Sequence, residues 1–98
     1  MTINYKEELS RELKALAQYL STFGEEEWSS FCHEASEKVL EDDKCIDLVW
    51  GNFAPTTEFD DFTVSFSRKC GDKEHEVTLR LQECANKIEG LAWKIRKR

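Results

Sequence analysis

The chain has 98 residues, 40% of them hydrophobic and 11% aromatic, and its 20 acidic residues outnumber its 14 basic ones to leave a net charge of −6. This length and composition predict a single folded domain over residues 1–98 and exclude a disordered chain. No apolar run approaches the roughly 20 residues that span a bilayer, and the first residues lack the apolar stretch of a secretory signal, so we expect a cytoplasmic protein without membrane contact.

Two helices are predicted first, over residues 5–23 and 25–40. In the first, leucines recur at spacings of three and four residues from Leu9 to Leu20, which is one face of a helix. Asn4 can cap its start, and Gly24 lies where a left-handed cap ends a helix. The short connection at Gly24 predicts that the two helices form an antiparallel hairpin. The apolar stripe of the second helix consists of Trp28, Phe31, Cys32, Ala35 and Val39.

The hydrophobic period then changes from 3.6 to 2 residues, which predicts strands. Alternation covers residues 45–50, 62–67 and 74–81, with polar residues on the outer side. A tight turn at 70–73 joins the last two strands, and residues 51–61 form a long loop between the first two.

A last helix is predicted over residues 82–96. The predicted fold is therefore α+β in the order α-α-β-β-β-α, a three-stranded antiparallel sheet with helices packed on one face.

The charge is uneven along the chain. Residues 25–61 hold 12 acids against two bases, whereas the last five residues carry a charge of +4. A duplex nucleic acid is a poor partner for such a chain, because affinity for phosphate comes from Lys and Arg. The acidic region predicts a basic protein as the partner instead. Trp93 and the basic residues around it form a small basic, aromatic patch, which is either a contact for nucleic acid or an acidic partner, or a lid on the core with a solubilising tail.

Acids and aromatics between residues 34 and 61 are the candidate partner-binding residues. A charge run is usually a solvated helix face. These acids are barely interleaved with lysine and adjoin aromatic residues, and that combination favours binding to a basic protein surface. Phe53 and Phe59 are equally well explained as plugs that fold the long loop onto the core. The candidates are Glu34, Glu37, Glu41, Asp42, Asp43, Asp47, Phe53, Glu58, Phe59, Asp60 and Asp61.

No catalytic or metal-binding motif is present in the sequence. The four cysteines form no Cys-x-x-Cys pair, and without a secretory signal we expect free thiols. The paired aspartates at 42–43 and 60–61 lack the spacing of a calcium loop, so no metal and no cofactor are expected. Cys70 and His75 are the candidates for a nucleophile and its base, but the exposed turn between them offers no pocket that excludes water.

These observations predict a small acidic protein-binding module that is not an enzyme. By analogy of size and charge with immunity proteins and phage-encoded inhibitors, we expect an inhibitor or immunity-type neutraliser of a basic, nucleic-acid-handling protein. The alternative is a small-molecule-binding or regulatory homodimeric module without catalysis, in which the sheet and helices enclose a pocket or the exposed face of the sheet pairs two copies. A third hypothesis is a small enzyme that uses Cys70 and His75.

Overall fold

The computed structural model of the chain describes residues 4–54 and 57–97, and this part of the chain is all helical. Its elements are α1 (Tyr5–Ser21), α2 (Glu27–Lys38), α3 (Asp43–Phe53), α4 (Glu58–Lys69), a short 3-10 turn η1 (Gly71–Lys73) and α5 (Glu74–Arg96). The described residues contain no strand. The predicted α+β fold with a three-stranded antiparallel sheet is therefore wrong.

The first two helices confirm the prediction. The side chain of Asn4 accepts a hydrogen bond from the Glu7 backbone N–H at 3.2 Å and so caps α1, which buries its leucine face. Gly24 has φ +78° in the connection, where glycine is favoured. The Ser10 hydroxyl donates to the Ser36 carbonyl at 2.6 Å and ties α1 to α2 inside the core.

Helix α3 replaces the strand predicted over residues 45–50. The Asp42 side chain caps it by accepting from the Lys44 N–H at 2.9 Å. Ile46 and Val49 are buried, whereas Leu48 is 55% exposed, so the buried positions follow a helix rather than an alternating strand. The expected loop over residues 51–61 is correspondingly short, because α3 runs to Phe53 and α4 begins at Glu58.

Helix α4 replaces the strand predicted over residues 62–67. That strand required Val64 to point inward and Thr63 outward, but Val64 is 51% exposed and Thr63 is buried. A buried hydroxyl is tolerated here because Thr63 Oγ1 donates to the Phe59 carbonyl one turn earlier, at 2.9 Å. Small polar residues that the alternating pattern placed on the outer side of a strand therefore lie on the buried face of a helix.

Helix α5 takes in the third predicted strand, residues 74–81, and the predicted last helix. Val77 and Leu81 are buried one turn apart, and Leu79 between them is 47% exposed. The same buried stripe continues through Ile88 to Ala92, so residues 74–96 form one helix. The predicted tight turn at 70–73 is real, but it joins two helices through η1.

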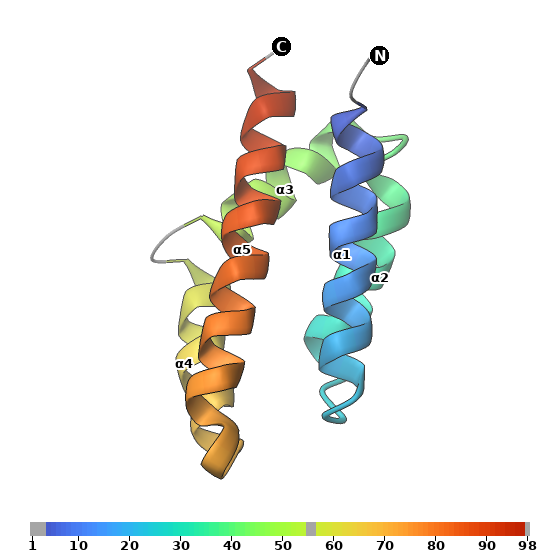
Figure 1. Cartoon of the computed structure of the whole chain (residues 1–98). Helices are drawn as coiled ribbons and strands as arrows, with labels where there is room; N and C mark the ends of the chain where they lie inside the picture. The colour runs from blue at the N-terminus through green and yellow to red at the C-terminus, as the bar shows by residue number, and fades with distance from the viewer. Residues whose placement is uncertain (1–3, 55–56, 98) are drawn as a thin grey trace.

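Figure 1 shows α1 and α5 side by side, with the start of α1 and the end of α5 at the same end of the molecule. Helix α5 is central, because it packs against α1, α3 and α4, while α2 packs mainly on α1. The molecule measures 42 × 25 × 22 Å. Among the described residues, no helix is both long and apolar enough to cross a membrane.

Candidate functional site

Aromatic side chains fill the space between α2 and α4. The two helices are fully described, and no Cα atom of one lies within 8 Å of a Cα atom of the other. Trp28, in the first turn of α2, nevertheless reaches α4: its ring centroid lies 5.1 Å from that of Phe59 and 5.4 Å from that of Phe62. The row continues from Phe62 to Phe66 at 5.2 Å. Rings rather than backbone contacts therefore join α2 to α4.

Two adjoining hollows lie over these rings, and both are lined by Glu27 and Trp28. The larger has a volume of about 450 Å³ and the smaller about 200 Å³. We call the two together the α2–α4 groove. Besides the two shared residues, its lining consists of Glu25, Phe31, Asn52, Glu58, Phe62, Ser65, Phe66 and Lys69.

Carboxylates dominate the rim of the α2–α4 groove. Glu27 and Glu58 are exposed in the first turns of α2 and α4, and among the described residues neither forms an ion pair with a base. The carboxylate of Glu25 already has one hydrogen bond, because its Oε1 accepts from the Trp28 backbone N–H at 3.2 Å. Lys69 is the one base in the lining, so its formal charge is −2 from three carboxylates and one ammonium. The groove has an aromatic floor and an acidic rim.

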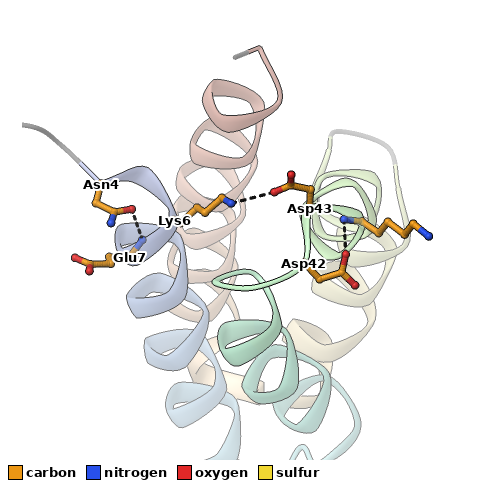
Figure 2. A network of polar contacts seen from close by, with 6 residues as sticks. Asn4, Lys6, Glu7, Asp42 and Asp43 are labelled. Carbon is orange, nitrogen blue, oxygen red and sulfur yellow. Dashed lines mark hydrogen bonds and ion pairs between the residues drawn. The ribbon is translucent and has the colours of Figure 1, made fainter.

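The predicted acids at the start of α3 have structural partners. Asp42 caps the helix, and Lys6 reaches from α1 to place its Nζ 3.0 Å from Asp43 Oδ1 (Figure 2). Asp47 lies 2.7 Å from Nε of Arg96 at the end of α5. Much of the charge predicted as binding surface here therefore caps a helix or joins helices.

An open hollow of about 630 Å³ lies beside these ion pairs, between the ends of α1, α3 and α5. Its charged side chains are Lys6, Asp43, Asp47 and Arg96, which already pair with one another across the two helix contacts. A ligand here would have to compete with both pairs, so the hollow offers no free charge of either sign.

The other predicted acids lie outside the groove, apart from Glu58. Glu34 and Glu37 are exposed on α2, and Glu37 Oε1 lies 3.5 Å from His33 Nε2. Glu41 is exposed after α2. Asp60 and Asp61 are exposed in the first turn of α4, where the helix dipole favours acids. The structure therefore does not gather the predicted acids into one surface.

Phe53 and Phe59 are core residues. Phe59 is 1% exposed, and its ring centroid lies 4.6 Å from that of Phe53, which is also buried. The sequence left open whether Phe53 and Phe59 bind a partner or plug the core, and the structure places both in the core. These rings support the floor of the groove from below and are not available to a partner.

None of the four cysteines, all of which lie in the described part of the chain, forms a disulfide. Burial, followed by the nearby Cys84, raises the pKa of Cys32 to about 12, and burial also raises the pKa of Cys45 and Cys84. The Cys70 Sγ donates to the Phe66 carbonyl at 3.5 Å, and His75 is exposed in the first turn of α5. No hydrogen bond joins this pair among the described residues, so the arrangement contains no assembled nucleophile and base.

Within residues 4–54 and 57–97, no group of three or more His, Cys, Asp or Glu side chains is placed to hold a metal ion. In comparisons with known proteins, the chain matches no family model, no curated protein and no solved structure.

Sequence reasoning missed most of the α2–α4 groove. It placed Trp28 and Phe31 on the apolar stripe of the second helix and did not include Glu25 or Glu27 among the candidate acids. Phe62 was assigned to a strand. The available signal was the concentration of aromatic residues at helical spacing in two segments, 28–31 and 59–66, each preceded by glutamate. This pattern indicates a groove only once the fold is known to place the two segments side by side.

Proposed function

We propose that this chain is a non-catalytic protein-binding module of the cytoplasm, and that its α2–α4 groove holds a basic, amphipathic segment of another protein. The observation that carries the proposal is that half-buried rings lie beside the carboxylates of Glu27 and Glu58, which form no ion pair with a base in the described part of the chain. Grooves that receive a helix use an apolar floor for affinity and rim charges for orientation and selectivity.

The floor suits apolar anchors. Trp28 and Phe62 are half-buried, so each offers part of its ring to a partner while the rest is held by neighbouring rings. A side chain that is already fixed loses little conformational freedom on binding, and aromatic residues are enriched among those that dominate binding energy. Leucine or aromatic side chains of the partner would cover this floor.

The rim suits lysine or arginine in the partner. Glu27 and Glu58 line the same hollow, so bases spaced along one helix face would meet both. Two carboxylates that line one hollow raise the negative potential there, which steers a basic segment toward the groove.

We extend the proposal to the class of partner: a basic, nucleic-acid-handling protein that the chain inhibits, as an immunity-type neutraliser does. Such a protein displays lysine and arginine to bind phosphate. The overall charge of −6 supports attraction to such a surface. A homodimer cannot form through an exposed sheet face as predicted, since the described residues form no sheet.

A defined peptide tests the binding mode. The basic peptide is a synthetic helix with lysines on one face and leucines with one tryptophan on the other; the acidic peptide has glutamates in place of the lysines. We expect titration calorimetry to detect binding of the basic peptide and no binding of the acidic peptide. The double variant Glu27→Lys/Glu58→Lys should weaken binding about tenfold, the ratio that corresponds to 1.4 kcal/mol.

The matched control is Glu34→Lys/Glu37→Lys, which makes the same charge change on exposed positions of α2 outside the groove. It should leave the affinity close to that of the wild type. Equal losses in both double variants would show that net charge alone attracts the peptide, and the groove would then be rejected as the site.

The inhibitory role has its own test. Proteins captured from the native host by the wild type and by the Glu34→Lys/Glu37→Lys control, but lost with Glu27→Lys/Glu58→Lys, are the expected partners. Purified wild-type chain should inhibit the nucleic-acid activity of such a partner, and the groove variant should not. A partner whose activity is unchanged by an excess of the wild-type chain would contradict the role as inhibitor.

A further inference from the structure

The last turn of α5 presents basic and aromatic side chains in a fixed arrangement. Trp93 stacks on Trp50 with ring centroids 6.0 Å apart and an angle of 30° between the rings. Trp93 is still 43% exposed, and Lys97 Nζ lies 5.3 Å from its ring centroid. Lys94 is exposed beside it, with Nζ 5.4 Å from the ring centroid of Tyr5. We call Trp93, Lys94 and Lys97 the basic end of α5.

The basic end of α5 is complementary to the α2–α4 groove. It offers one exposed indole ring and two ammonium groups, neither of which is ion-paired with a carboxylate among the described residues. The groove offers half-buried rings and the carboxylates of Glu27 and Glu58. The stack on Trp50 holds Trp93 in place, which lowers the entropy cost of using it as an anchor.

We propose that the α2–α4 groove of one molecule receives the basic end of α5 of a second copy of this chain. The inference rests on the proposed function, since it assigns an occupant to the same groove. The start of α2 and the end of α5 lie toward opposite ends of the molecule (Figure 1), so one molecule does not fill its own groove. The contact uses different surfaces on the two copies, and it leaves a free groove and a free basic end on every pair.

This contact is weak and sensitive to salt. Its attraction comes from exposed charges, whereas the net charge of −6 on each copy opposes association at long range. At about 0.15 M salt the Debye length is about 8 Å, which screens the long-range repulsion more than the direct contacts. A tighter basic partner would displace the second copy, so self-association keeps the groove covered until that partner is present.

Complementary variants test the contact by sedimentation velocity. The groove variant, Glu27→Lys/Glu58→Lys, keeps its basic end; the end variant, Lys94→Gln/Lys97→Gln, keeps its groove and carries no charge that could pair with the lysines of the groove variant. At about 0.15 M salt we expect the wild type to grow in average mass with concentration and each variant alone to stay monomeric. An equal mixture should form a dimer and nothing larger, because only one productive contact remains. Raising the salt to about 1 M should dissociate both assemblies.

A monomeric wild type at all attainable concentrations, or a mixture that stays monomeric, would overturn the proposal. Association of either variant alone would overturn it as well. Circular dichroism checks that both variants remain helical. The end variant retains the groove, so it should bind the basic peptide like the wild type; peptide binding without self-association would reject this inference alone, and loss of both would reject the proposed function too.

Discussion

At the level of single residues, the aromatic side chains between α2 and α4 divide into a buried set and a half-buried set. Phe53 and Phe59 are closed off from solvent, whereas Trp28, Phe31 and Phe62 keep part of their surface exposed. The buried rings fix the half-buried ones through edge and tilted contacts such as that of Trp28 with Phe59 at 5.1 Å. Stability and binding are thereby assigned to neighbouring but different side chains.

Truncation of Phe59 tests this division. Because its side chain is fully buried in the ring cluster, Phe59→Ala should lower the free energy of unfolding by about 3–5 kcal/mol. Leu48→Ala removes an apolar side chain that is mostly exposed, so its effect should stay within about 0.5 kcal/mol. Urea unfolding followed by circular dichroism measures both; similar effects of the two substitutions would contradict the packing described.

Cys32 makes the stability depend on alkaline pH. Its pKa rises from 9.0 to about 12 in the folded chain because burial disfavours the thiolate. Below pH 9 the thiol is protonated in both states and contributes no pH dependence; between pH 9 and 12 the unfolded chain loses the proton while the folded chain keeps it. Stability should therefore fall as the pH rises through this window.

The measurement is the free energy of unfolding at a series of pH values from 8 to 11, for the wild type and for Cys32→Ala. The variant is less stable overall because of the cavity, but its stability should fall less steeply above pH 9. Parallel curves for the two proteins would show that Cys32 ionises freely in the folded chain.

At the level of elements, α1 and α3 begin at side-chain caps, and the errors of prediction came from the buried faces. The Asn4 cap and the leucine face of α1 are readable from the chain, whereas Asp42, which caps α3, was predicted as a partner-binding acid. The later segments alternate by chance over six to eight residues, and a short alternating run does not distinguish a strand from a helix. The unbroken stripe from Val77 to Ala92 was the signal that favoured one long helix.

The glycine within α5 offers a test at this scale. An added Cβ at Gly90 would meet no heavy atom within 4 Å outside the helix's own backbone. Since alanine is a better helix former than glycine, Gly90→Ala should stabilise the protein by about 0.8–1 kcal/mol. Thermal unfolding measures the change. A destabilised variant would mean that α5 is bent or closely packed at this residue.

At the level of the whole molecule, the pairing of α2 with α4 could not be predicted from the sequence. Its residues are distant along the chain, and their approach depends on α5 packing against both α1 and α4. The predicted fold placed residues 62–67 on a strand and residues 51–61 in a loop, so it contained no helix α4 beside Trp28. Glu58 is among the candidates predicted from the sequence, but Glu27, which lines the same hollow, is not. The acidic composition is evident from the sequence, but the arrangement of the acids on the surface depends on the fold.

Nuclear magnetic resonance gives the most direct test of the groove. Amide resonances of the ¹⁵N-labelled chain are followed as the basic peptide is added, at a protein concentration where the chain is monomeric. We expect the largest shifts at Glu27, Trp28, Asn52, Glu58 and Phe62, including the indole N–H of Trp28, and small shifts at Glu34 and Glu37. Shifts centred on the outer face of α2 or on the start of α3, with the groove residues unmoved, would contradict binding in the α2–α4 groove.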